Sequence, residues 1–153
     1  MKNKVVIITG ATSGIGYACA RYFAQQGCHI VIAARNEEKL KRIGSELKSL
    51  YGNCLAVPTD VAIETECKNL IQKTIETFGC IDILINNAGI SMRALLNDVS
   101  INVMHQVMDI NFWGTVNCTK YALPYLIKSQ GSVVGVSSIA GKKGLPARCA
   151  YSA

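Results

Sequence analysis

Three glycines near the N-terminus have a spacing that suits the binding of a phosphate group. Gly10, Gly14 and Gly16 come directly after an uninterrupted apolar run at residues 5–8, and a helical pattern begins near Ile15. Such a run is typical of a strand that is buried on both faces. Backbone N–H groups at a helix start attract anions, and glycine lets a pyrophosphate approach the backbone closely. The segment therefore predicts an anion-binding corner; the alternative is a tight turn without a ligand.

Four further apolar runs predict the other strands of the same sheet. They lie at residues 29–34, 54–57, 81–85 and 132–136, and patterns of helical periodicity separate them. Strands that alternate with helices indicate right-handed βαβ units. We therefore expect an α/β fold, a doubly wound Rossmann-type parallel sheet with helices on both faces. A single domain over residues 1–153 would contain five strands of that sheet.

The predicted helices carry their own start and stop signals. Asn36 and Ser100 stand where N-caps are expected, and Leu50 continues the apolar stripe of the second helix. Pro124 lies within the apolar pattern of the last long helix. A proline there should kink the helix or mark its last turn, because it lacks the N–H that the helix needs.

Glycine-rich or polar stretches follow all five predicted strands. The carboxyl ends of parallel strands meet at one edge of the sheet, which is where doubly wound folds bind their ligands. Five such stretches at one edge indicate a binding site rather than a purely structural fold. They are residues 9–16, 34–35, 60–61, 86–89 and 137–138.

The composition excludes several other classes of protein. No apolar run approaches the roughly 18 residues that cross a bilayer, and we expect no signal peptide. The seven cysteines are scattered and odd in number, without a C-x-x-C pair. This favours free thiols in a reducing cytoplasm over a disulfide framework or a metal site. The net charge is +6, and several of the basic residues lie beside glutamates in the predicted helix that follows Asn36. Such a helix is typical of a solvated face rather than a nucleic-acid footprint.

The ordered set of motifs resembles the short-chain dehydrogenase/reductase superfamily over essentially the whole chain. The set comprises the glycine turn, Asp60-Val61, the segment 86–89, Asn111, and Ser138 thirteen positions before Tyr151. The resemblance implies an NAD(P)-dependent oxidoreductase that interconverts a secondary alcohol and a ketone or aldehyde by hydride transfer. It also implies a small-molecule substrate, a homodimer or homotetramer, and further C-terminal strands beyond the five present here.

The resemblance implies a cofactor site made from four of the five polar stretches. Asp60 would accept a hydrogen bond from the adenine amino group, although a helix N-cap is an alternative role for it. The segment 86–89 would pass beneath the nicotinamide-side ribose and also tie its strand to the sheet. The expected cofactor-binding residues are Gly10, Thr12, Ser13, Gly14, Ile15, Gly16, Arg35, Asp60, Val61, Asn87, Ala88 and Gly89.

The end of the second strand bears on the choice of cofactor. Relatives that use NAD place an acid there, which binds the ribose hydroxyls. Here Ala34 occupies that position and Arg35 follows it. An acid would repel a 2′-phosphate, whereas an arginine can pair with it through two hydrogen bonds. We therefore expect NADP(H) to be preferred over NAD(H); the alternative role of Arg35 is a surface charge near a helix start.

The same resemblance implies a catalytic set of Asn111, Ser138 and Tyr151. The tyrosine would donate or accept the proton, the serine would hold the substrate oxygen, and the asparagine would position a water. Ser137 competes with Ser138, and the spacing to Tyr151 favours Ser138. The family's lysine would fall two positions after Ala153, so we expect residues 1–153 alone to be inactive. A non-catalytic dinucleotide sensor and an inactive truncated fragment remain as alternatives.

Overall fold

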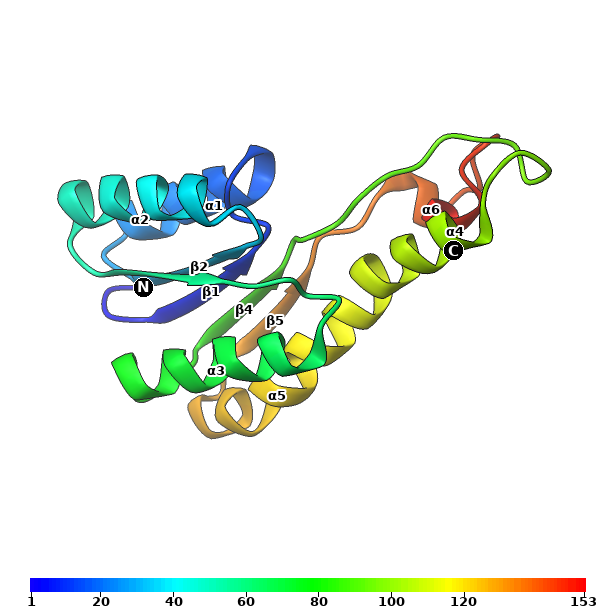
Figure 1. Cartoon of the computed structure of the whole chain (residues 1–153). Coiled ribbons are helices and arrows are strands. Elements are labelled where there is room, and N and C mark those ends of the chain that lie inside the picture. The colour runs from blue at the N-terminus through cyan, green and yellow to red at the C-terminus, as the bar shows by residue number, and fades with distance from the viewer.

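The computed structural model describes residues 1–153 and contains a five-stranded parallel sheet in the order β3-β2-β1-β4-β5. This confirms the predicted α/β fold, with parallel pairing between all neighbouring strands. Strand β1 is central, so the glycine turn that follows it lies at the middle of the sheet edge (Figure 1). The strands are β1 (Val5–Thr9), β2 (His29–Ala34), β3 (Cys54–Pro58), β4 (Ile83–Asn86) and β5 (Ser132–Gly135).

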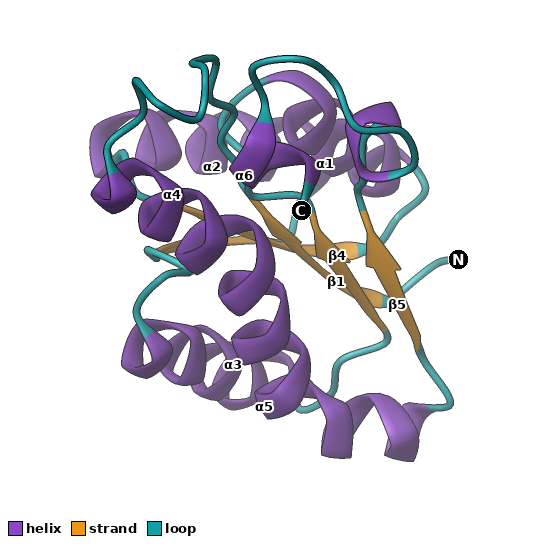
Figure 2. Ribbon diagram, turned by 90° about the vertical axis from the view of Figure 1, so that its right-hand side faces the viewer, coloured by secondary structure: helices purple, strands orange, loops and turns teal.

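Helices cover both faces of the sheet, as Figures 1 and 2 show. Alternate residues of β1 point to opposite faces, so Val6 and Ile8 join one core cluster while Val5 and Ile7 join the other. Every residue of β1 is buried, which explains its uninterrupted apolar sequence. Helices α1 (Gly14–Gln25) and α2 (Glu37–Tyr51) pack on the first face, and α3 (Glu64–Phe78) and α5 (Gly114–Ser129) pack on the second.

The helix boundaries agree with the predicted caps, with one exception in the buried stripe. Asn36 accepts a hydrogen bond from the Lys39 N–H at 2.9 Å at the start of α2. Ser100 accepts one from the Asn102 N–H at 3.3 Å at the start of α4 (Ile101–Met108). Leu50 is 58% exposed, so the predicted stripe of α2 ends at Leu47, one turn before the helix itself ends.

One long helical segment follows Ser100 and contains a π-helical turn. Helix α4 runs directly into η1 (Asp109–Trp113), a π-helix, and then into α5. Pro124 does not mark the last turn, because α5 continues to Ser129 beyond it. The irregular turn of this segment is the π-helix at Asp109–Trp113, which the sequence did not predict. Single π-helical turns within α-helices often occur at functional sites.

An extension projects from the carboxyl ends of β4 and β5 (Figure 1). It contains the loop at residues 90–100, the loop at residues 142–148, α4, the 3₁₀-helix η2 (Ile139–Gly141) with its cap Ser138, and α6 (Cys149–Ser152). Its core is small, with three buried residues: Met92, Val107 and Ala150. No helix of the structure has both the length and the apolar character needed to span a bilayer.

Candidate functional site

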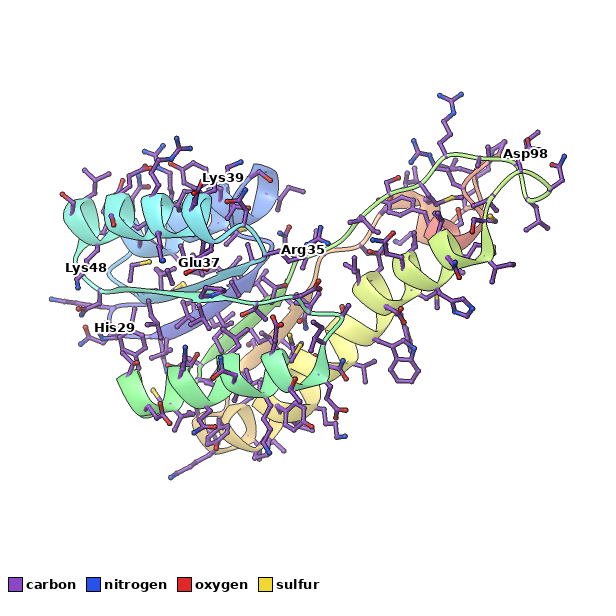
Figure 3. The ribbon with its side chains drawn as sticks, in the orientation of Figure 1. His29, Arg35, Glu37, Lys39, Lys48 and Asp98 are labelled. Carbon is purple, nitrogen blue, oxygen red and sulfur yellow. The ribbon has the colours of Figure 1, made fainter.

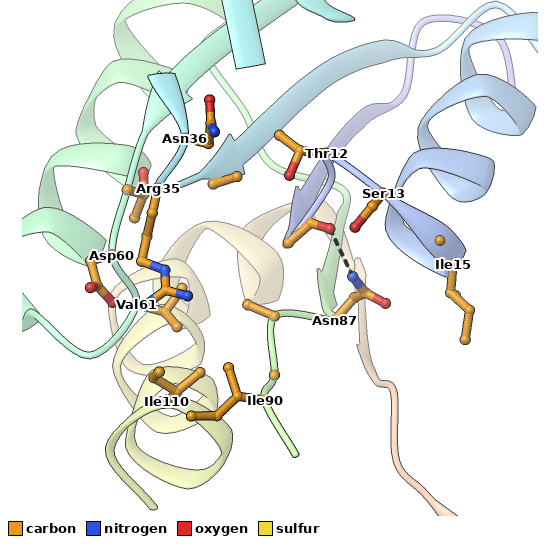
Figure 4. Close-up of a pocket in the computed structure, with 16 residues that line it drawn as sticks. Thr12, Ser13, Ile15, Arg35, Asn36, Asp60, Val61, Asn87, Ile90 and Ile110 are labelled. Atoms are coloured by element: carbon orange, nitrogen blue, oxygen red, sulfur yellow. Dashed lines mark hydrogen bonds between the residues drawn. The ribbon is translucent and has the colours of Figure 1, made fainter. Parts of the chain in front are cut away.

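A cavity of about 740 Å³ opens at the carboxyl ends of β1, β2, β3 and β4 (Figure 4). Four of the five polar stretches contribute to its wall, and eleven of the twelve predicted cofactor-binding residues line it. Gly16 is the exception. The lining residues are Gly10, Thr12, Ser13, Gly14, Ile15, Ala34, Arg35, Asn36, Thr59, Asp60, Val61, Asn87, Ala88, Gly89, Ile90 and Ile110.

The three glycines of the turn have two different physical roles. Gly10 has φ of +65°, and a Cβ atom there would lie 2.8 Å from the Ala88 Cα. A Cβ atom on Gly16 would lie 2.6 Å from the Gly10 carbonyl oxygen, so only glycine lets α1 approach β1 this closely. Gly14 has φ of +52° and no atom within 4 Å of the space where a Cβ would lie. Gly10 and Gly16 therefore permit close backbone packing, and Gly14 leaves the helix start open to the cavity.

Hydrogen bonds fix the turn after β1 to the segment after β4. The Thr9 hydroxyl oxygen accepts from the Asn87 N–H and from the Ala88 N–H, each at 3.0 Å. The Asn87 side-chain amide donates to the Thr9 carbonyl at 2.9 Å. It also donates to the Gly10 carbonyl at 3.2 Å, the bond that the dashed line marks in Figure 4. We call Thr9–Gly16 together with Asn87–Gly89 the cradle. The expected tie between strands is present, and Thr9, which was not among the predicted site residues, is central to it.

Arg35 lines the cavity wall at the end of β2, as the close-up in Figure 4 shows. Its guanidinium is exposed and takes part in none of the three ion pairs of the chain. Ala34, the preceding residue, is buried and uncharged. A positive charge without a protein partner therefore lies beside the cavity, where no acidic side chain follows β2 directly.

Asp60 also lines the cavity, beside Arg35 in Figure 4, and forms a local turn. Its Oδ1 atom accepts from the Ala62 N–H at 3.1 Å, and its own N–H donates to the Glu66 carboxylate at 2.6 Å. The N-cap of α3 is Ile63, so the alternative role of Asp60 as the cap of that helix is wrong. The second carboxylate oxygen of Asp60 makes no hydrogen bond within the chain and is free to accept one from a ligand.

Asn111 lies in the π-helical turn and binds the backbone of Ile90. Its Oδ1 accepts from the Ile90 N–H and its Nδ2 donates to the Ile90 carbonyl, both at 2.9 Å. This pair of bonds connects the long helix to the chain that leaves β4, and it places Ile90 on the cavity wall. These two bonds use one N–H of the Asn111 amide and one lone pair of its oxygen.

Ser138 and Tyr151 lie in the extension, outside the cavity wall. The Ser138 hydroxyl accepts from the Ala140 N–H at 3.2 Å and caps η2. Tyr151 lies in α6 against the small core of the extension, with the Arg148 guanidinium 5.7 Å from the centre of its ring. No hydrogen bond joins any two of Asn111, Ser138 and Tyr151. Ser138 and Tyr151 thus belong to two short helices in contact, η2 and α6, and their hydroxyl groups are not hydrogen-bonded to each other.

Five lining residues were not among the predicted site residues. Three of them are neighbours of Arg35 or Asp60 in the sequence: Ala34, Asn36 and Thr59. Their adjacency to predicted site residues could have identified them as lining residues. Ile90 and Ile110 look like ordinary core residues in the sequence, and only the fold places them on the wall. The Asn111 bonds hold Ile90 there.

Comparisons with known proteins identify the class to which this fold and site belong. The sequence model of the family described as short chain dehydrogenase matches residues 4–153, and the chain belongs to that family. The chain is 40% identical over 153 residues to the 11-beta-hydroxysteroid dehydrogenase-like 3 protein of Arabidopsis thaliana, covering 99% of this chain and 50% of that protein. It is 42% identical over 161 residues to dehydrogenase/reductase SDR family member 7B of Bos taurus, covering 100% and 49%. The chain thus spans about half the length of these curated relatives.

Two solved structures have nearly the same fold. An alcohol dehydrogenase from Thermococcus sibiricus, complexed with 5-hydroxy-NADP, has a TM-score of 0.96 at 28% identity, covering 99% of this chain and 65% of that one. A short chain dehydrogenase/reductase from Burkholderia phymatum, in complex with NAD, has a TM-score of 0.95 at 29% identity, covering 99% and 54%. The matched part of each structure includes the whole sheet and cradle of the present chain.

Proposed function

We propose that this chain is the dinucleotide-binding part of an NADP(H)-dependent oxidoreductase that interconverts a secondary alcohol and a ketone or aldehyde. Its membership of the short chain dehydrogenase family supports the oxidoreductase class. The two similar structures carry 5-hydroxy-NADP and NAD, which supports a nicotinamide dinucleotide as the cofactor. The observation that carries the preference for NADP(H) is the free guanidinium of Arg35 at the cavity wall.

The residues at the cavity fit the chemistry of such a cofactor. Gly10 and Gly16 leave no room for a side chain where the backbone turns, and Gly14 opens the start of α1 to an anion. The exposed Arg35 matches a 2′-phosphate, and the free oxygen of Asp60 matches an amino group. When bound, the nicotinamide supplies or accepts the hydride. The protein must then hold the substrate oxygen and move one proton.

We assign these proton-transfer roles to the extension. Tyr151 is the proton donor or acceptor, and its hydroxyl makes no hydrogen bond within the chain. Ser138 holds the substrate oxygen; its hydroxyl accepts from the Ala140 N–H and keeps its own hydrogen to donate. Asn111 acts as a positioning residue, because both polar atoms of its side chain bind Ile90. The substrate is a small carbonyl or alcohol compound, and we propose that the intact protein acts in the cytoplasm as a homodimer or homotetramer.

Equilibrium titration with NADPH and NADH, followed by nicotinamide fluorescence, tests the proposed cofactor preference. We expect tighter binding of NADPH and expect Arg35→Ala to weaken it by about tenfold while changing NADH binding little. Arg42→Ala is the matched control, since Arg42 is also exposed and lies on α2 away from the cavity wall. Equal or tighter binding of NADH, or an Arg35→Ala variant with unchanged preference, would contradict the proposal.

A second candidate function is dinucleotide sensing without catalysis. It is favoured by the absence of any hydrogen bond among Asn111, Ser138 and Tyr151 and by the position of the last two outside the cavity wall. The intact protein distinguishes the two functions. An oxidoreductase loses its carbonyl reduction in the Tyr151→Phe variant and retains its affinity for the cofactor. A sensor shows no turnover to lose.

A further inference from the structure

Two cysteines that lie far apart in the sequence are in contact between α3 and α5. The Sγ atoms of Cys67 and Cys118 are 3.5 Å apart, and both side chains are fully buried. The two helices lie side by side in both views of the ribbon (Figures 1 and 2). The other five cysteines have no cysteine partner within hydrogen-bond distance. The pair has no role in the proposed reaction, and it was not predicted because no short motif connects the two residues.

The pair is connected to the wall of the cavity through one carbonyl group. Cys118 donates to the Cys67 sulfur, and Cys67 donates to the Val61 carbonyl at 3.3 Å. Val61 is buried and lines the cavity beside Asp60. Its side chain lies against Gly114 at the start of α5, where a Cβ atom would fall 2.6 Å from the Val61 Cγ2. A chemical change at the Cys67 and Cys118 sulfurs therefore alters the hydrogen bond to Val61, which forms part of the cavity wall.

The two thiols differ in their readiness to react. The hydrogen bond from Cys118 lowers the pKa of Cys67, an effect that outweighs its burial. The same hydrogen bond, together with burial, raises the pKa of Cys118. The thiolate is the reactive form of cysteine, so Cys67 is the nucleophile of the pair and Cys118 is the thiol that reacts second.

We propose that Cys67 and Cys118 form a reversible, redox-sensitive disulfide that weakens dinucleotide binding through Val61. A hydroperoxide is the oxidant. The Cys67 sulfur attacks one peroxide oxygen, the O–O bond breaks, and a sulfenic acid and one molecule of water or alcohol result. The Cys118 thiol then attacks the sulfenic sulfur, the S–S bond forms, and a second molecule of water leaves. The protein loses two hydrogens and two electrons in all, and the peroxide is reduced.

The distance between the two sulfurs suits formation of a disulfide, and the disulfide would remove a hydrogen bond at Val61. A disulfide requires an S–S distance of about 2.05 Å, so the sulfurs must approach by roughly 1.5 Å. Because neither sulfur is exposed, the reaction depends on transient opening between α3 and α5 and is slower than oxidation of a surface thiol. The product has no S–H, so the Val61 carbonyl loses its donor and the segment 60–63 becomes less stable. The effect on binding rests on the proposed function, whereas formation of the bond does not.

Treatment of the reduced 153-residue chain with hydrogen peroxide tests the proposal. We expect a cross-linked peptide containing Cys67 and Cys118, faster hydrogen exchange at residues 60–63, and NADPH binding weakened by about threefold to tenfold. Dithiothreitol should reverse all three. Cys118→Ser should abolish the cross-link while keeping the Cys67 bond to Val61. Cys28→Ala is the matched control, because it removes a buried thiol and leaves the pair intact.

The outcomes separate this proposal from the proposed function. If peroxide gives no Cys67–Cys118 peptide in the wild-type chain, or if the cross-link leaves exchange at residues 60–63 unchanged, the redox proposal is wrong. If the cross-link and the exchange appear as expected but the reduced chain binds neither dinucleotide, the proposed function fails and the disulfide stands. If the reduced chain binds NADPH and the oxidised chain binds it equally well, the effect on the site is refuted.

Discussion

The cradle and the extension are stabilised in different ways. In the cradle, buried backbone groups and glycines fix the positions, and Thr9 and Asn87 connect two strands through four hydrogen bonds. In the extension, the Ala94 N–H donates to the Ala147 carbonyl at 2.9 Å, Arg148 donates to Ser91, and the core has three buried residues. The region proposed to bind the cofactor is therefore tied to two buried strands. The region proposed to move the proton depends on a small core and a few contacts between loops.

The largest expected effect comes from Gly16→Ala in the cradle. The added Cβ atom would meet the Gly10 carbonyl oxygen at 2.6 Å and the Asn87 side-chain nitrogen at 2.5 Å. We expect the free energy of unfolding to fall by about 2–3 kcal/mol and dinucleotide binding to be lost. Urea denaturation measures the first effect. Gly144→Ala in the extension is the control, because no atom lies within 4 Å of its added Cβ. Equal effects of the two changes would contradict the comparison.

Thr9→Val should have the next largest effect. Valine has the shape of threonine but leaves the Asn87 and Ala88 N–H groups without an acceptor. We expect a loss of about 1–3 kcal/mol in the free energy of unfolding and weaker binding of the dinucleotide. Thr77→Val removes a hydroxyl from the exposed face of α3 and should change neither by a measurable amount. A Thr9→Val variant as stable as the wild type would show that the tie between β1 and β4 contributes little.

Acid should destabilise the opposite end of the same two strands. Burial alone would raise the pKa of Asp82, but hydrogen bonds from the Lys4 ammonium at 2.7 Å and the Val5 N–H at 2.9 Å hold it below its usual value. The carboxylate therefore stabilises the fold above the ordinary aspartate pKa, and this contribution is lost as the pH falls through the lowered one. Unfolding of wild type and Asp82→Asn as a function of pH should reveal a smaller pH dependence in the variant below about pH 4.

Glu37→Gln serves as the control for that pH dependence. The pKa of Glu37, labelled in Figure 3, is also lowered by its hydrogen bond with Lys41, but both side chains are more than half exposed on α2. An exposed pair contributes little to stability, so the variant should follow the wild-type curve. A pH dependence that disappears in Glu37→Gln and persists in Asp82→Asn would reverse our assignment.

Arg148→Ala should have the smallest effect on global stability. The side chain contacts Ser91, the Met92 carbonyl and the Tyr151 ring, all within the extension. We expect less than about 0.5 kcal/mol of change in unfolding but faster hydrogen exchange at residues 91–94. NADPH affinity should stay unchanged, as it should in Arg93→Ala, which removes an exposed arginine of the same loop. Weakened cofactor binding in Arg148→Ala alone would show that the extension supports the cradle.

The sequence predicted the cradle better than the extension for a physical reason. Strand β1 is buried on both faces and the glycines permit specific close contacts, so local residue types define the structure there. The π-helical turn that places Asn111 depends on how the long helix packs, and no local pattern encodes it. Ser138 and Tyr151 were predicted from the family resemblance, and their positions depend on contacts between loops that are distant in the sequence. The contact between Cys67 and Cys118 likewise follows from tertiary packing alone.

Hydrogen exchange of the chain with and without NADPH tests the central claim most directly. We predict that the dinucleotide slows exchange most strongly at the glycine turn, at Arg35 and Asn36, and at the segments 59–62 and 87–90, which together line the cavity. NADH should protect the glycine turn but give less protection at Arg35 and Asn36, since it has no 2′-phosphate for the guanidinium. Absence of protection at the glycine turn with either dinucleotide would contradict the account.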